Sequence, residues 1–203
     1  MIAIIDYGMG NLHSVKNALD HLGIENIITS DIHVIQSAEK LILPGVGAFY
    51  DCMENLRSNG LIEVILERVS AGVPLLGICL GMQVLFEDGY EVEHVKGLGL
   101  LKGSVTLMED PNVKIPHIGW NALNFNHRTS LQKYLSKTPF VYFVHSYRAT
   151  QLDDANLIAY ANYGSLRIPA LVQKGNVVGA QFHPEKSAED GLAILKWFEE
   201  EFS

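Results

Sequence analysis

The sequence has few cysteines, no basic leader and no long uninterrupted hydrophobic run. Its 203 residues include two cysteines, Cys52 and Cys79, which are too few for a disulfide framework and favour a reducing, cytoplasmic location. The opening segment, MIAIIDYGMGN, is strand-like and lacks the basic start of a signal peptide. The longest apolar run, residues 73–86, is interrupted by Gln83 and falls short of the ~20 residues that span a bilayer. We therefore expect no association with a membrane.

Basic residues and metal-binding patterns are also scarce. The chain carries 15 Lys and Arg against 23 Asp and Glu, and its formal net charge of −8 disfavours binding to nucleic acid. The eight histidines contain no pair at the spacing of a metal site, so we expect no metal. The glycine-rich turns DYGMGNLH and LPGVGAFYD lack the third glycine of the dinucleotide fingerprint, and we predict no cofactor.

The first half of the chain alternates between short apolar runs and helical patterns. Hydrophobic residues make up 48% of the chain and charged residues 19%, and no linker divides residues 1–203, so we expect one domain. The patterns predict strands at residues 2–5, 40–47 and 73–81, and helices at residues 10–23, 48–60, 61–72 and 82–88. This alternation predicts an α/β fold with a mostly parallel central sheet covered by helices on both faces.

The second half of the chain is dominated by strand-like segments. These are GSVTLM, IGWNALNF, FVYFVHSYRA, NLIAYANYG, IPALVQKG and VVGAQFHPE. We expect them to form a mixed or antiparallel section that continues the sheet. The chain closes with an amphipathic helix over SAEDGLAILKWFEEEF.

The run Gly77-Ile78-Cys79-Leu80-Gly81 has the form of a nucleophile elbow with cysteine in place of serine. A sharp strand-to-helix turn strains the nucleophile's backbone and brings its neighbours close together, which favours glycine on both sides. The following helix would point its N-terminus at the sulfur, and the Leu80 N–H could stabilise an oxyanion. The alternative is an inert core cysteine, the role that we assign to Cys52.

A cysteine nucleophile needs a base, and His183 is the best-placed candidate. It ends the strand-like VVGAQF, and Pro184 keeps it out of the helical region, so we expect an extended chain in which His183 and Glu185 face the same side. The segment Gly45-Val46-Gly47 ends a predicted strand, where a second oxyanion donor could lie. The alternatives are a strand followed by solvated side chains and a tight turn into a helix.

Taken together, GICLGMQ and the late HPEKS resemble the class I (triad) glutamine amidotransferases. DYGMGNLHSV, LPGVGAF, KGLGLLKGSV, KIPHIGWN and FVHSYRA follow in the order seen in one branch of that family, the glutaminase subunits of imidazole glycerol phosphate synthase in histidine biosynthesis. The resemblance covers essentially the whole chain. It implies a flavodoxin-like amidotransferase fold and the hydrolysis of glutamine to glutamate and ammonia.

The resemblance also implies roles for individual residues. It makes Cys79 the nucleophile, His183 the acid and base, and Glu185 the partner that orients His183. It places the oxyanion donors at Leu80, Val46 and Gly47. It places bound glutamine against Gly47, Gln83, Glu91, His145, Ser146 and Tyr147, although the local sequence EDGYE departs from the family's usual Ser-x-Glu.

The resemblance further implies a partner. In the family this is a cyclase subunit with a (β/α)₈ barrel, which forms a heterodimer with the glutaminase and receives its ammonia. The implied interface contains Asn11, Trp120, Asn121 and Lys186; the alternatives are that Trp120 is a core aromatic and Lys186 a solvated charge. Rival functions are a stand-alone cysteine hydrolase, a glutaminase subunit of another synthase, and a binding module with an inactive triad.

Overall fold

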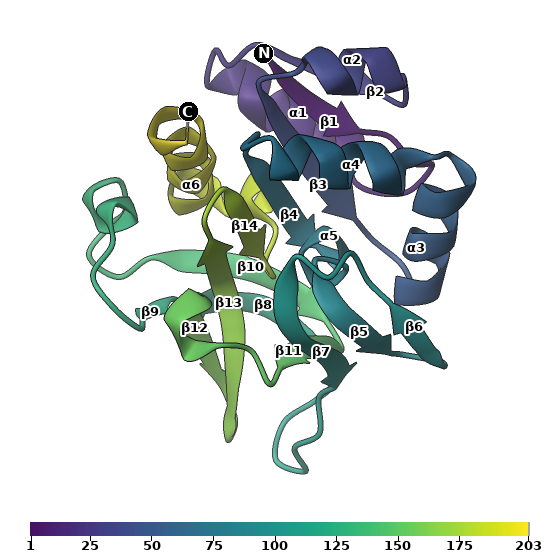
Figure 1. Ribbon diagram of the computed structural model, residues 1–203. Coiled ribbons are helices and arrows are strands. Elements are labelled where there is room, and N and C mark those ends of the chain that lie inside the picture. The colour runs from purple at the N-terminus through teal and green to yellow at the C-terminus, as the bar shows by residue number, and fades with distance from the viewer. Residues whose placement is uncertain (203) are drawn as a thin grey trace.

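The computed structural model describes residues 1–202 and shows an α/β fold built on an eight-stranded sheet (Figure 1). The strand order is β2-β1-β3-β4-β14-β13-β12-β9, and the first five strands are parallel. The bounds of these five are β2 Asn26–Thr29, β1 Ile2–Ile5, β3 Lys40–Gly45, β4 Leu75–Cys79 and β14 Val177–Ala180. The predicted fold class is confirmed.

Helices cover both faces of this sheet and create two apolar cores. Successive residues of a strand point to opposite faces, so Ile2 and Ile4 of β1 pack in one core while Ala3 and Ile5 pack in the other. Helices α1 (Leu12–His21) and α6 (Ala188–Glu201) cover the first face. The second face is covered by α2 (Ile32–Ser37), α3 (Phe49–Ser58) and α4 (Leu61–Ser70).

The second half of the chain is distributed over three sheets, so the expectation that it continues one sheet is correct only in part. Strands β13 (Leu166–Lys174), β12 (Leu157–Tyr163) and β9 (Asn124–Phe125) extend the main sheet in antiparallel fashion. A four-stranded sheet contains β11 (Tyr147–Thr150), β7 (Leu101–Leu107), β5 (Phe86–Tyr90) and β6 (His94–Lys96). A two-stranded sheet contains β10 (Phe140–His145) and β8 (His117–Ala122).

The helix predicted over residues 82–88 is wrong. Helix α5 (Leu80–Gln83) is a single turn, and β5 begins at Phe86. The carbonyl of Val84 accepts a hydrogen bond from the Leu98 N–H, and β5 pairs in parallel with β7. Pairing with a segment farther along the chain therefore overrides the local helical pattern.

Three short 3₁₀ helices complete the fold of residues 1–202: η1 (Ser130–Lys133), η2 (Asp154–Asn156) and η3 (Pro184–Lys186). Within residues 1–202, no helix has both the length and the apolar character needed to cross a membrane.

Candidate active site

The site is built around the turn between β4 and α5. Cys79 ends β4 with φ 55° and ψ −110°, a backbone conformation that is strained for any residue other than glycine. A Cβ atom on Gly81 would overlap the carbonyl oxygen of Leu43 in β3, and one on Gly77 would lie 2.5 Å from the carbonyl oxygen of Gly81. The glycines on either side of Cys79 are therefore required by close backbone contact, as the elbow pattern predicts.

His183 and Glu185 lie just beyond β14 and contact each other. The Nδ1 atom of His183 is 2.8 Å from Oε1 of Glu185, and their side chains are only 2% and 1% exposed. The prediction is correct at His183, whose φ of −99° and ψ of 98° are extended, but it is wrong beyond it, because β14 ends at Ala180 and the backbone turns into η3 from Pro184 onward. The tight turn, rather than strand alternation, brings the carboxylate back to the imidazole.

Hydrogen bonds from three other segments fix this pair. The His183 N–H donates to the Tyr142 carbonyl of β10 at 2.9 Å, and the Ser187 hydroxyl donates to the His183 carbonyl at 2.6 Å. The Asn11 amide donates to Oε1 of Glu185 at 3.2 Å. Asn11, which the resemblance placed at the interface, thus also contacts the carboxylate of the pair.

The electrostatic surroundings favour a protonated His183. Burial disfavours the imidazolium, but the neighbouring Cys79 and the Glu185 carboxylate outweigh this effect and raise the pKa of His183 to about 9. The pKa of His145, in contrast, is lowered to about 3, because burial disfavours its charged form. One charged and one neutral imidazole therefore lie close together near neutral pH.

Cys79, His145 and His183 line one cavity of about 300 Å³. It is lined by Val46, Gly47, Cys79, Leu80, Gln83, Glu91, Val144, His145, Ser146, Tyr147 and His183. The structure thus gathers the predicted nucleophile, base, oxyanion segment and glutamine contacts from positions about a hundred residues apart. Glu185 lies behind His183, in contact with its far nitrogen.

Two cavity side chains make bonds within the protein that limit what they can offer a ligand. The Gln83 amide nitrogen donates to the Tyr147 carbonyl and to Oε1 of Gln181, both at 3.1 Å, which leaves its carbonyl oxygen to accept from a ligand. Glu91 accepts a 2.7 Å hydrogen bond from the backbone N–H of Phe49, at the start of α3, through Oε2. Glu91 lines the cavity despite the altered local sequence, with one of its two carboxylate oxygens held by Phe49.

The segment between β3 and α3 forms another wall of the cavity. Gly47 has φ +102°, and a Cβ there would lie 2.5 Å from the Met9 methyl carbon. Val46 is 41% exposed, whereas the preceding Pro44 is held by a 2.9 Å hydrogen bond from the buried Tyr7 hydroxyl to its carbonyl oxygen. The segment is thus held in place at Pro44 and exposed at Val46, where it reaches the cavity.

Sequence reasoning missed Gln181. Its side chain is fully buried, and its amide nitrogen lies 3.9 Å from the Cys79 sulfur. The signal was present, because a glutamine at a buried position two residues before His183 needs hydrogen-bond partners. Cys52 is buried in α3, in keeping with its predicted packing role.

The predicted interface residues lie apart from the cavity lining. Trp120 on β8 is 52% exposed, so it is not a core aromatic, and Lys186 is exposed in η3. Asn121, next to Trp120, donates to the Asn162 carbonyl at 2.9 Å. No cluster of three or more potential ligands that could hold a metal occurs in residues 1–202.

The match to known families is decisive. Residues 3–200 match the model of the glutamine amidotransferase class-I family. The chain belongs to the class I glutamine amidotransferases.

Curated relatives place this amidotransferase within one branch of the family. It is 58% identical over 200 residues to the imidazole glycerol phosphate synthase subunit HisH of Lactococcus lactis, covering 98% of both chains. It is 50% identical to the HisH subunit of Oceanobacillus iheyensis, again over 98% of both chains. The HisH subunit of Aquifex aeolicus is 47% identical, over 96% of this chain and 94% of the relative.

Solved structures support the fold. A glutamine amidotransferase crystal structure superposes with a TM-score of 0.77 at 22% identity, covering 98% of this chain and 97% of that one. A chain of the PurLQS structure from Thermotoga maritima gives a TM-score of 0.76 at 23% identity, covering 100% of this chain and 98% of the other.

Proposed function

We propose that this chain is a glutaminase that hydrolyses glutamine to glutamate and ammonia and supplies the ammonia to a cyclase subunit. The cyclase would use it to form imidazole glycerol phosphate and aminoimidazole carboxamide ribotide in histidine biosynthesis. One observation carries the proposal: Cys79 and the His183–Glu185 pair meet at a single cavity in a chain that is 58% identical to a HisH subunit.

The proposed reaction is acyl transfer through a thioester. The Cys79 thiolate attacks the side-chain amide carbon of glutamine, and His183 protonates the departing nitrogen so that ammonia leaves. His183 then removes a proton from water, which attacks the thioester and releases glutamate and the thiol. Because its pKa is raised to about 9, His183 carries the required proton at neutral pH. Glu185 stabilises that imidazolium and fixes its Nδ1–H.

The negative charge that develops on the amide oxygen needs fixed donors. We assign this role to the N–H of Leu80, which follows the strained Cys79, and to an N–H of residues 46–47, which follow the register partner of Cys79 in β3. Losing one such donor costs about 10²–10³ in rate. The exposure of Val46 makes this segment a suitable gate, because a change in its peptide orientation would complete or remove the second donor.

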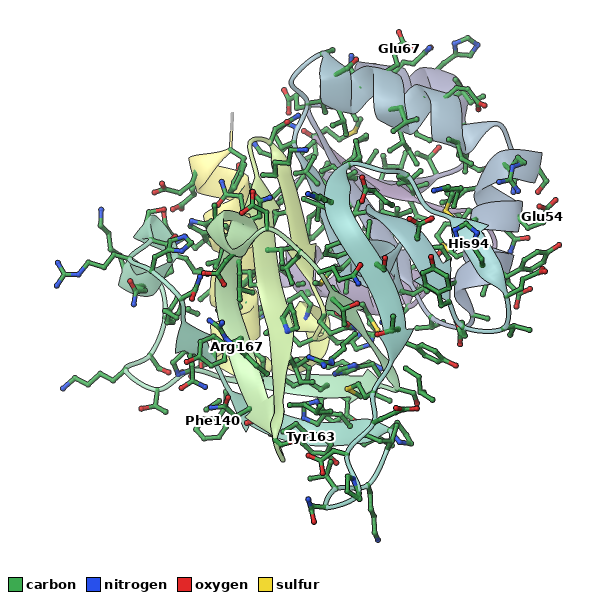
Figure 2. The ribbon with its side chains drawn as sticks, turned by 60° about the horizontal axis from the view of Figure 1, so that its bottom comes forward. Glu54, Glu67, His94, Phe140, Tyr163 and Arg167 are labelled. Carbon is green, nitrogen blue, oxygen red and sulfur yellow. The ribbon has the colours of Figure 1, made fainter. Side chains whose placement is uncertain are left out.

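An exposed apolar face next to the cavity supports the proposed partner. We define the apolar face as Ile118 and Trp120 on β8 together with Phe140 and Val144 on β10; their exposed fractions are 58%, 52%, 47% and 37%. In the register of these strands, alternate side chains point to the same side. Figure 2 shows Phe140 projecting at the outer edge of the molecule. A cluster of this kind marks an interaction surface.

The position of this face fits ammonia transfer. Val144 belongs both to the apolar face and to the cavity lining, so a partner that covers the face would also cover the mouth of the cavity. Ammonia released into water becomes ammonium, which is not a nucleophile, and a dry passage into the partner avoids this loss. We therefore propose a heterodimer with a (β/α)₈ cyclase, with Asn11, Trp120, Asn121 and Lys186 near the interface.

The first test separates the nucleophile from the second thiol. We expect Cys79→Ala to abolish glutamate release in the presence of the cyclase subunit while leaving binding of that subunit intact. Cys52→Ala is the matched control, because burial raises the pKa of this thiol to about 12 and keeps it unreactive. Glutaminase activity that survives Cys79→Ala would overturn the assignment.

The second test concerns the partner. We expect the isolated chain to be nearly inactive and the cyclase with its ligand to activate it; full activity of the lone chain would instead favour a stand-alone hydrolase. Trp120→Ala should weaken binding to the cyclase by about tenfold or more in calorimetric titration. Val92→Ala, at an 85% exposed apolar residue outside the apolar face, is the control and should bind normally. Equal affinities for both variants would place the interface elsewhere.

A further inference from the structure

Two buried histidines outside the triad form a direct hydrogen-bonded pair. His117 on β8 and His145 on β10 are opposite each other in the two-stranded sheet. Nδ1 of His117 is 3.1 Å from Nε2 of His145, and the two residues are 2% and 6% exposed. His145 lines the cavity, whereas the role of His117 is not explained by the reaction described above.

The neighbours of the pair determine which nitrogen of each ring carries a proton. Nδ1 of His145 lies 2.8 Å from the Tyr147 carbonyl oxygen, which can only accept, so this Nδ1 is protonated. In the neutral ring Nε2 of His145 must then accept, and the Nδ1–H of His117 is its donor. Nε2 of His117 in turn accepts from the Asn121 amide nitrogen at 3.4 Å.

The backbone fixes the orientation of the Asn121 amide. Its Oδ1 accepts from the Ala122 N–H at 2.8 Å, and its Nδ2 donates to the Asn162 carbonyl at 2.9 Å. Because an N–H and a carbonyl hold opposite ends of this amide, it cannot be flipped without losing both bonds. The series of hydrogen bonds from Asn121 through His117 to His145 is thus held by backbone groups at both of its ends, and all of its bonds run in one direction.

The surroundings keep both rings neutral. His117 is stacked between Phe143 and Tyr163, with ring centroids 4.6 Å and 4.0 Å away, and burial lowers its pKa to about 4. Protonating either ring would also bring two N–H groups face to face. The cavity that His145 lines also holds the ionisable groups Cys79, Glu91, Tyr147 and His183, and His117 stacks on Tyr163.

The same chain of hydrogen bonds continues to the proposed nucleophile. The Tyr147 carbonyl accepts from Gln83 as well as from His145, and Gln83 donates to Gln181. The Gln181 amide nitrogen lies 3.9 Å from the Cys79 sulfur. A continuous path of polar contacts thus links β8, which carries the exposed Trp120, to the sulfur.

We propose that His117 is a positioning residue that holds His145 as its neutral Nδ1–H tautomer and thereby orients Tyr147, Gln83 and Gln181 around the Cys79 thiol. A neutral His145 does not compete with His183 for the catalytic proton and does not repel its charge. The part of this inference that concerns activity rests on the proposed glutaminase function, whereas the tautomers are a property of the folded chain itself.

The tautomers can be tested without an activity assay. In the full chain labelled with ¹⁵N-histidine, NMR distinguishes a protonated Nδ1 from a protonated Nε2. We expect two of the eight histidines to remain neutral Nδ1–H tautomers from about pH 5 to pH 8. The signal of His117 is assigned by its loss in His117→Phe. Titration of either ring in this range, or an Nε2–H tautomer, would overturn the proposal.

The effect on catalysis is tested with two substitutions of His117 in the complex with the cyclase. His117→Phe keeps an aromatic ring between Phe143 and Tyr163 but removes the donor, so we expect kcat to fall about tenfold or more, since one buried hydrogen bond is lost. The pH profile of kcat/KM should also change, because His145 can then take up a proton. His117→Asn places an amide N–H near the position of Nδ1 and should recover activity to within about threefold of the wild type.

The outcomes separate the two proposals. A His117→Phe variant that is folded and matches the wild type in kcat and pH profile would refute the positioning role. If His117→Phe does not fold, failure of His117→Asn to keep the wild-type pH profile refutes it instead. An inactive wild-type complex would refute the proposed function, while the NMR result would still decide the tautomers.

Discussion

The buried pair of His183 and Glu185 makes the stability of this protein depend on pH. Burial opposes protonation, but Cys79 and Glu185 outweigh it and raise the pKa of His183 to about 9, compared with about 6.5 in an unfolded chain. Below about pH 6.5 the ring is protonated in both states, and its contacts contribute fully to stability. Above that pH only the folded protein keeps the proton, so the contribution falls and is lost as the pH passes about 9.

The size of the effect follows from the two pKa values. One pH unit corresponds to about 1.4 kcal/mol, so a change in pKa from 6.5 to about 9 corresponds to about 3 kcal/mol of unfolding free energy. Glu185→Gln keeps the shape of the side chain and removes its charge. Because Cys79 has the larger favourable effect on His183, we expect this variant to lose on the order of 1 kcal/mol of the pH dependence. Adding Cys79→Ala should remove most of the remainder.

Urea unfolding at about pH 6, 7.5 and 9 measures this difference. Subtracting the unfolding free energy of the variant from that of the wild type at each pH cancels the contributions of groups that the substitution does not affect. Glu189→Gln is the control, because it removes the same charge from an exposed position in the first turn of α6. We expect the control to follow the wild type. If the difference in unfolding free energy between the wild type and Glu185→Gln is the same at all three pH values, the predicted effect of Glu185 on the pKa of His183 is refuted.

Two glycine substitutions test the elbow and the neighbouring segment at residues 46–47. Gly81→Ala should lower the unfolding free energy by more than ~3 kcal/mol in denaturant unfolding, because its methyl would overlap the Leu43 carbonyl. Gly23→Ala, whose methyl would meet no described atom within 4 Å, should cost only ~1 kcal/mol for its left-handed backbone. Gly47→Ala combines φ +102° with a close approach to Met9, so we expect a loss of stability of at least the ~1 kcal/mol of Gly23→Ala and a fall in kcat of about 10² or more. Unchanged kcat would exclude residue 47 from the oxyanion site.

The elements that the sequence predicts well are those whose pattern is local and whose environment is uniform. Strand β1 begins and ends as predicted, at Ile2 and Ile5, because an apolar run between two covered faces has no other stable place. Helices α1, α3 and α4 each end two residues before the glycine predicted to close them, which is Gly23, Gly60 and Gly72 respectively. The sequence does not predict strand β2 or helix α2, because their short and half-exposed segments carry weak periodicity.

The predictions that failed share a physical cause. The segment at residues 82–88 has a helical pattern, but pairing between β5 and β7 decides its conformation. FVYFVHSYRA reads as one strand, yet it breaks at Ser146 and its halves join different sheets. In both cases the backbone partners lie elsewhere in the chain, and local propensity is weaker than those contacts.

The sequence by itself determined the elbow around Cys79, the closeness of His183 and Glu185, and the family. The two glycines and the two-residue spacing act over a few bonds, so they can be recognised without knowing the rest of the fold. Only the tertiary structure decided that Gln181 meets the sulfur and that His117 meets His145. Those contacts join separate strands, and the direction of their hydrogen bonds depends on backbone groups that the folded sheets bring together.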